Sequence, residues 1–231
     1  MTKILITRPE HQARTTIKAL DEAGLSTFAD PLLHLKEIPH AVDDYASYEA
    51  FIVTSGNSFS FWDMTGVDKD KPLIAVGSQT ARLAAEHGFT SITDINGTAR
   101  NIQDHLNGEK ALHVGGYHIS HSLGDHVERL IVYEAVPAEE LSAACKQALE
   151  RGEIELAMFY STRTAKIFVR LIQAAELEHR LEAVKVLSMS ANVIRSVRVL
   201  PWADMYKSSM PNGTAMIDAC KRIMNDEYEP A

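Results

Sequence analysis

Turns rich in glycine, serine and threonine follow several short apolar segments of this sequence, and each of these segments is typical of a β-strand. The turns are Thr7-Arg8, Thr54-Ser55-Gly56, Gly77-Ser78, Gly115-Gly116 and Ser161-Thr162. A helix is predicted after each turn, and the start of a helix presents free backbone N–H groups and the positive end of the helix dipole. Several such turns around one site would suit a ligand with several carboxylates. The alternative is that each turn only caps its helix, because Ser, Thr and Asn are good N-cap residues.

The turns carry no nucleotide-binding or nucleophile motif. Gly77-Ser78-Gln79-Thr80 lacks the lysine of a P-loop, and Gly115-Gly116 lacks the spacing of a dinucleotide-binding fingerprint. No serine lies in a Gly-x-Ser-x-Gly motif. A Ser/His/Asp triad cannot be assembled from spacing alone. The residues by themselves therefore predict an anion-binding site and do not identify a reaction.

A metal site is not expected from the histidines and cysteines. His113, His118, His121 and His126 are separated by five, three and five positions, which places no clean pair of ligands on one helix face. The two cysteines, Cys145 and Cys220, stand far apart among alanines and form no Cys-x-x-Cys motif. Two reduced, buried thiols are the expected outcome.

Composition excludes several classes of protein. The chain has 231 residues with 45% hydrophobic and 23% charged residues, which is ordinary for a globular protein. A net charge of −8 and a pI near 5.7 disfavour a nucleic-acid partner. No segment approaches the roughly 18 apolar residues of a membrane span, and the run Ile4–Ile6 is too short for a signal peptide. A cytoplasmic protein without a membrane partner is expected, with a monomer as the default.

Strands and helices are predicted to alternate along most of the chain, which favours a parallel sheet. Besides the strands before the turns, we predict strands at Ser26–Ala29, near Ser91, and at Leu130–Val136, Val184–Ser188 and Val197–Leu200. Helices are predicted at Glu10–Ala23, after Thr54–Ser58, and at Ala81–His87, Ala99–Leu106, from Gly116 to about Val127, and at Glu139–Glu150, Thr164–Ala175 and Asn212–Met224.

The two halves of the chain resemble each other. The strand and turn ending in Thr54-Ser55 correspond to those ending in Ser161-Thr162, and the opening strand Ile4–Thr7 corresponds to Leu112–Gly115. The fold class expected is α/β, with two similar flavodoxin-like domains that have parallel sheets and face each other across a cleft. One domain comprises residues 1–33 and 138–231, and the other comprises residues 42–129. Residues 34–41 and 130–137 are the linker strands, which pair as a two-stranded ladder.

Five segments together resemble the uroporphyrinogen-III synthase family. They are Leu5-Ile6-Thr7-Arg8-Pro9, Pro31-Leu32-Leu33, Ile52-Val53-Thr54-Ser55-Gly56-Asn57-Ser58, Ala75-Val76-Gly77-Ser78-Gln79-Thr80-Ala81 and Val132-Tyr133-Glu134-Ala135-Val136-Pro137. Each motif is weak alone, but their order and spacing cover nearly the whole chain. Two turns depart from the family pattern: Met189 and Asn192 replace its glycine and Thr-Ala pair, and Arg163 follows Ser161-Thr162 where a proline or serine is usual.

The resemblance implies a reaction that needs no cofactor. Linear hydroxymethylbilane loses its hydroxyl as water, and the resulting azafulvene is attacked by the substituted α-carbon of the distal ring, ring D. The spiro intermediate then fragments and recloses with ring D inverted, which gives uroporphyrinogen III. The substrate carries eight carboxylates, which agrees with the recurrent N–H-rich turns.

The resemblance also implies roles for individual residues. Tyr133 lies on a crossing strand, where its phenol, protonated at neutral pH, could assist departure of the hydroxyl. The alternative is a tyrosine that packs in the ladder with its hydroxyl bonded locally. Arg8 is predicted to pair with a substrate carboxylate, the alternative being a solvated surface charge. The residues expected to contact acetate and propionate groups through backbone or hydroxyl are Thr7, Ser55, Gly77, Gly115, Ser161 and Thr162.

Two rival functions remain open at this point. One is a non-catalytic module of the same fold that binds a tetrapyrrole or another polycarboxylate. The other is a two-domain small-molecule binder of the periplasmic type, which the missing signal peptide argues against.

Overall fold

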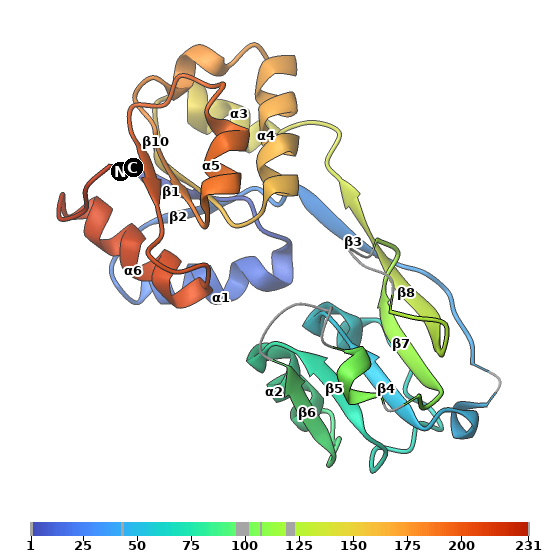
Figure 1. Ribbon diagram of the computed structural model, residues 1–231. Coiled ribbons are helices and arrows are strands. Elements are labelled where there is room, and N and C mark those ends of the chain that lie inside the picture. Colours follow the sequence, from blue (N-terminus) through green and yellow to red (C-terminus); the bar gives the residue numbers. More distant parts are fainter. Residues whose placement is uncertain (1, 43, 96–101, 107, 119–122, 231) are drawn as a thin grey trace. The chain divides into compact units, whose positions relative to one another are not determined.

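The computed structural model describes residues 2–42, 44–95, 102–106, 108–118 and 123–230 (Figure 1). Contacts divide the chain into unit 1, Met1–His34 with Val136–Ala231, and unit 2, Leu35–Ala135. Both boundaries fall within strands, since the chain passes from unit 1 to unit 2 in β3 (Leu33–Glu37) and returns in β8 (Val127–Pro137). Each unit contains its own sheet and its own hydrophobic clusters.

Unit 1 is built on a five-stranded sheet with the order β11-β10-β9-β1-β2. Its elements are β1 (Lys3–Ile6), α1 (Glu10–Asp21), β2 (Thr27–Ala29), α3 (Ala143–Glu150), β9 (Ile154–Phe159), α4 (Thr162–Ala174), η5 (Glu178–Leu181), β10 (Lys185–Ser188), α5 (Ala191–Val197), β11 (Met205–Lys207) and α6 (Gly213–Met224). Every neighbouring pair of strands is parallel. The carboxyl ends of all five strands therefore lie at one edge of the sheet.

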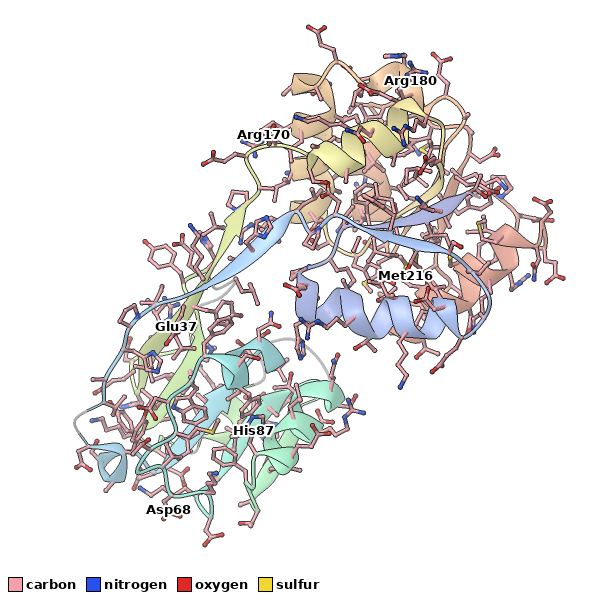
Figure 2. All side chains as sticks on the ribbon, turned by 180° about the vertical axis from the view of Figure 1, so that it is seen from behind. Glu37, Asp68, His87, Arg170, Arg180 and Met216 are labelled. Carbon is pink, nitrogen blue, oxygen red and sulfur yellow. The ribbon has the colours of Figure 1, made fainter. Side chains whose placement is uncertain are left out.

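Alternating side chains of unit 1 face two layers of helices. Ile4 and Ile6 of β1 pack with Leu20 of α1 and Met216 of α6, which cover one face of the sheet (Figures 1 and 2). On the other face, Phe159 of β9 meets Phe168 of α4 with ring centroids 5.1 Å apart. Helices α3, α4 and α5 lie on this second side (Figure 1). This two-sided burial explains why the central strands are mostly apolar, with their charged residues, Lys3, Glu155 and Lys185, near their amino ends.

Unit 2 is built on a six-stranded sheet with the order β3-β8-β7-β4-β5-β6. Its further elements are η1 (Tyr45–Ser47), β4 (Ala50–Val53), η2 (Gly56–Ser60), β5 (Leu73–Val76), α2 (Ser78–Glu86), β6 (Ile92–Ile95), η4 (Gln103–His105) and β7 (Ala111–Gly116). From β8 to β6 all neighbouring pairs are parallel. β3 joins the outer side of β8, where the amide of Ile38 donates to the carbonyl of Val132 at 3.0 Å.

The direction in which strands are added reverses once in each sheet. In unit 1 the chain lays down β1 and β2 and then returns to the other side of β1 with β9. In unit 2 it lays down β4, β5 and β6 and returns to the other side of β4 with β7. At such a reversal the two neighbouring loops leave in opposite directions, and this is where open parallel sheets bind ligands.

Some predicted elements were wrong. The segment before Val127 is not helical where it is described: Gly124 has a φ of +94° and β8 already begins at Val127, where it gains ladder bonds to β7. Val197–Leu200 is not a strand, because Val193, Ile194 and Val197 form the buried face of α5 at helical spacing. The edge strand is instead β11, a three-residue segment with no clear strand pattern.

Two predicted helices proved shorter or different. The helix after Thr54–Ser58 is only the 3-10 helix η2. Of the helix predicted at Ala99–Leu106, residues 99–101 lie outside the described residues, and the remainder contains the 3-10 helix η4. Within the described parts of the chain, no helix combines the length and apolar character of a membrane span.

Candidate functional site

The reversal in the sheet of unit 1 brings four predicted site residues together. Thr7 and Arg8 directly follow β1, and Ser161 and Thr162 directly follow the neighbouring strand β9. Thr7 is fully buried and its hydroxyl donates to the carbonyl of Met158 at 3.0 Å, so this hydroxyl ties the two strand ends together. The Ser161 hydroxyl accepts from the amide of Thr164 at 3.1 Å and caps α4.

Arg8 is a half-buried cation with neutral neighbours. Its guanidinium donates to the hydroxyl of Thr16 at 3.2 Å and to the side-chain oxygen of Gln12 at 3.0 Å. It also lies 4.1 Å from the ring centroid of Tyr160, a cation–π contact. Burial lowers the pKa of Arg8, and Tyr160 opposes that shift. The burial of Arg8 argues against a solvated surface charge, and no acid among the described residues pairs with it.

Unpaired polar atoms accompany Arg8 in unit 1. Within the described residues, Arg8 Nε and the hydroxyls of Tyr160 and Ser188 are buried without a hydrogen-bond partner. Ser188 ends β10, the strand beside β9. Buried polar groups are rarely left unpaired without a reason. Ser188 is the register partner of Phe159, which faces α4, whereas Tyr160 packs with the cluster of α1 and α6. Arg8 and the Tyr160 hydroxyl therefore share one face of the sheet, and a cation beside a hydroxyl donor suits a carboxylate. Sequence reasoning gave Tyr160 and Ser188 no role, because their unpaired atoms become visible only in the packed structure.

The reversal in unit 2 gathers the other predicted residues. Ser55 follows β4, and its hydroxyl accepts from the amide of Asn57 at 3.4 Å. Gly77 follows β5 and precedes α2 with a φ of +90°, a conformation open to glycine and strained for other residues. Gly115 lies near the end of β7. Neither Gly77 nor Gly115 has a side chain, so only their backbone groups can meet a ligand.

Tyr133 stands beside the glycine pair at the end of β7. Gly116 is the register partner of Tyr133, and a Cβ added to Gly116 would fall 2.8 Å from the tyrosine ring. The ring is mostly buried and its centroid lies 5.5 Å from that of Phe61. Among the described residues the Tyr133 hydroxyl has no hydrogen-bond partner. The alternative of a hydroxyl bonded locally within the ladder is therefore not what this part of the structure shows.

A buried histidine occupies the opposite side of the same glycine pair. His113 is 1% exposed, and a Cβ added to Gly115 would fall 2.7 Å from its ring carbon Cε1. Its Nε2 lies 3.0 Å from the hydroxyl of Thr54, which directly follows β4. Burial, reinforced by the charge of Arg129, lowers the pKa of His113 to about 4. Sequence reasoning weighed His113 only as a metal ligand and missed this contact.

No metal centre is found in the described residues, where no group of three or more His, Cys, Asp or Glu side chains could hold an ion. His121, one of the histidines considered for such a site, lies outside the described residues. Cys145 and Cys220 are buried free thiols, and burial raises the pKa of both.

A family model described as uroporphyrinogen-III synthase HemD matches residues 14–218 of this chain. The chain belongs to the uroporphyrinogen-III synthase family. Membership places it among the hydro-lyases of porphyrin biosynthesis. The resemblance noted from the sequence motifs is thereby confirmed.

Individual relatives agree with the family. The chain is 29% identical over 209 residues to a uroporphyrinogen-III synthase of Chlorobaculum parvum. The match covers 79% of this chain and 84% of that protein. It is 26% identical over 204 residues to the porphyrin biosynthesis protein HemD of Ruminiclostridium josui, covering 77% of this chain but 40% of that protein. The crystal structure of uroporphyrinogen-III synthetase from Helicobacter pylori 26695 has a TM-score of 0.66 and 19% identity, covering 96% of this chain and all of that one. This likeness confirms the two-sheet α/β fold.

Proposed function

We propose that this chain converts hydroxymethylbilane into uroporphyrinogen III, with Tyr133 assisting loss of the hydroxyl group. The observation that carries the proposal is the phenol of Tyr133, which bonds none of the described residues and lies beside Gly116, next to the reversal in the sheet of unit 2. A phenol can donate its proton to a departing hydroxyl, which leaves as water. The spiro intermediate then fragments and recloses, and the free α-carbon of ring D loses its hydrogen as a proton in the final closure. That proton balances the one given by the phenol, so the net change is the loss of one water.

Each unit by itself offers groups at its strand ends that suit a carboxylate of the substrate. Arg8 supports this proposal because its guanidinium has no acidic partner among the described residues. Thr7, Ser55, Gly77, Gly115, Ser161 and Thr162 supply backbone amides or hydroxyls at the same edges of their sheets. Because such contacts are distributed, no single one of these six should be indispensable. We also retain the domain bounds 1–33 with 138–231 and 42–129, supported by contact boundaries after His34 and Ala135.

A monomer is proposed as the working state. The large apolar side chains that the described residues expose are Tyr117, Val199 and Met210, too few for the apolar centre of an obligate interface. Light scattering at micromolar concentration should return the monomer mass, 25.6 kDa. A concentration-independent dimer mass would refute this part of the proposal.

The function is tested by supplying purified protein with freshly generated hydroxymethylbilane and separating the oxidised products into isomers I and III. A predominance of isomer III demonstrates cyclisation with inversion of ring D. Isomer I alone, as the spontaneous reaction gives, from correctly folded protein would leave a non-catalytic binding module of the same fold.

A further inference from the structure

The contact between His113 and Thr54 joins two neighbouring strands at the reversal in unit 2. His113 belongs to β7, and Thr54 is the first residue beyond β4. His113 Nε2 is 3.0 Å from Thr54 Oγ1, whereas His113 Nδ1 is buried and has no partner among the described residues. Thr54 is partly exposed, whereas the histidine ring that its hydroxyl contacts is buried.

The protonation state of the ring limits what this contact can be. With its pKa lowered to about 4, His113 is neutral at physiological pH, so one ring nitrogen carries a hydrogen and the other a lone pair. If Nδ1 carried the hydrogen, a buried N–H donor would lack an acceptor, which native structures rarely allow. If Nε2 carries it, that N–H donates to Thr54 Oγ1 and only a lone pair on Nδ1 stays unpaired.

The tautomer of His113 with its hydrogen on Nε2 determines the direction of the Thr54 hydroxyl. Once Thr54 Oγ1 accepts from His113 Nε2, its own hydrogen has to point away from the ring. Thr54 makes no other side-chain hydrogen bond within the described residues. Its O–H is therefore available to a ligand that only accepts hydrogen bonds, and an ionised carboxylate is such a ligand.

We propose that His113 is a positioning residue that holds the Thr54 hydroxyl as a hydrogen-bond donor to one carboxylate of the substrate. This inference rests on the proposed function and adds a binding contact to it. It also gives a reason for Gly115, since a side chain there would collide with the histidine ring. His113 acts through Thr54 and does not itself touch the substrate.

The tautomer is tested on the wild-type protein by long-range proton–nitrogen NMR of histidine side chains. His40 supplies an internal reference of the opposite kind, because its Nδ1 donates to the carbonyl of Ile38 at 2.9 Å and its Nε2 accepts from the amide of Asp63 at 3.2 Å. His87, labelled in Figure 2, likewise has Nδ1 at 2.8 Å from the carbonyl of Leu83. His113 should show an Nε2–H signature at pH 7. An Nδ1–H signature would overturn the proposal.

Kinetics of variants test the function of the contact. Thr54→Val and His113→Phe should each raise KM for hydroxymethylbilane roughly tenfold, the loss of one hydrogen bond to a charged group, with kcat little changed. The double variant should be no worse than either single one, because both remove the same contact. Thr54→Ser, which keeps the hydroxyl, should retain most of the wild-type KM.

Ser58→Ala is the matched control. Ser58 is buried nearby, and its hydroxyl donates to the carbonyl of Val114 at 3.0 Å on the same strand as His113. This variant should lower stability and leave KM unchanged. Additive effects of Thr54→Val and His113→Phe, or a KM unaffected by Thr54→Val, would refute the positioning role. Failure of the wild type to form isomer III would instead refute the proposed function. The NMR experiment would still report the tautomer of His113, because that measurement does not depend on activity.

Discussion

Tyr133 is the residue at which the structure adds most to the sequence. Its ring is buried against Gly116 and Phe61, yet no described residue bonds its hydroxyl. A structural tyrosine in such a position normally satisfies its hydroxyl. Because the hydroxyl bonds no described residue, its removal should change turnover and leave stability nearly unchanged.

Tyr133→Phe should reduce turnover by roughly 100-fold or more, the usual size of general acid catalysis, while the free energy of unfolding stays nearly constant. Tyr45→Phe is the control, because the Tyr45 hydroxyl donates to the carbonyl of Asp63 at 2.8 Å and accepts from Trp62 Nε1 at 3.1 Å. That variant should lose about 1 kcal/mol of stability and keep its turnover. Near-wild-type turnover in folded Tyr133→Phe would exclude the proposed proton donor.

His113 should make unit 2 sensitive to acid. Its pKa is about 4 in the folded protein against 6.5 for the model group, so the unfolded chain binds the proton first as pH falls. This group costs no stability above pH 6.5, and the free energy of unfolding then falls with pH until the loss is about 3 kcal/mol at pH 4. Urea unfolding at pH 7, 5.5 and 4.5 should show a weaker pH dependence in His113→Phe than in the wild type. Equal slopes would contradict the lowered pKa.

The candidate site residues that could be predicted from sequence are those that belong to a short local sequence pattern. A strand followed by Ser-Thr or Gly-Ser and then a helix predicted that Ser55, Gly77, Ser161 and the turn after β1 lie at strand ends, and the structure has them there. Tyr160, Ser188 and the His113–Thr54 contact depend on which strands become neighbours in the sheet, and His113 is 59 positions from Thr54 in the chain. No local pattern carries that information.

At the scale of elements, the helices that begin at the strand ends could serve structure alone or structure and binding together. Helices α3 and α4 of unit 1 offer a comparison, since each has a serine N-cap. The Ser142 hydroxyl accepts from the amide of Cys145 at 3.0 Å, and the Ser161 hydroxyl accepts from that of Thr164 at 3.1 Å. Of these two caps, only Ser161 lies at the reversal in the sheet.

Ser161→Ala and Ser142→Ala should each lower the free energy of unfolding by about 1 kcal/mol, the usual effect of losing an N-cap. Ser161→Ala should in addition raise KM for hydroxymethylbilane, whereas Ser142→Ala should not. Thermal unfolding and steady-state kinetics on both proteins measure the two effects. Identical KM values would leave Ser161 with a capping role only.

A substitution at Gly77 tests whether the start of α2 requires the positive φ of this residue. With a φ of +90°, and no atom within 4 Å of an added Cβ, Gly77→Ala meets conformational strain without a clash. It should cost about 1–3 kcal/mol in urea unfolding. Gly213→Ala, at the first position of α6 with neither positive φ nor a neighbour, should be neutral or slightly stabilising. A neutral Gly77→Ala would show that the turn relaxes freely.

The elements that sequence predicted well are those with strong periodicity and clear stops. Helix α1 and the strand β10 lie within a residue or two of their predicted positions, and β4 and β5 end directly before the predicted turns at Thr54 and Gly77. The failures have physical causes. Val197–Leu200 contains two β-branched residues, but Val197 completes the buried face of α5. The strand β11 forms beside β10, where it pairs with the outer side of that strand. Tertiary pairing decided both outcomes against local propensity.

At the scale of the whole molecule, each unit has a tryptophan within its own packing. Trp62 of unit 2 packs against Phe51 and Phe89, and Trp202 of unit 1 stacks on Phe168. The chain contains no other tryptophan. Single-tryptophan variants therefore report unfolding of one unit at a time.

A core change in one unit should lower the urea midpoint of that unit alone. Leu112→Ala in unit 2 and Leu156→Ala in unit 1 remove matched, buried side chains and should each cost about 2–5 kcal/mol. The first should shift the Trp62 transition and leave the Trp202 transition in place, and the second should do the reverse. If both transitions moved together in both variants, the two units would unfold as one cooperative body.

The glycine pair that ends β7 has a consequence for how related sequences can diverge. Each glycine leaves room for one particular ring, that of His113 beside Gly115 and that of Tyr133 beside Gly116. The constraint on each glycine thus belongs to its neighbour and not to the backbone, since neither glycine has a positive φ. Where evolution replaces the histidine by a small residue, a side chain becomes tolerable at position 115, so these two positions should exchange together. Position 116 should stay glycine wherever the tyrosine persists.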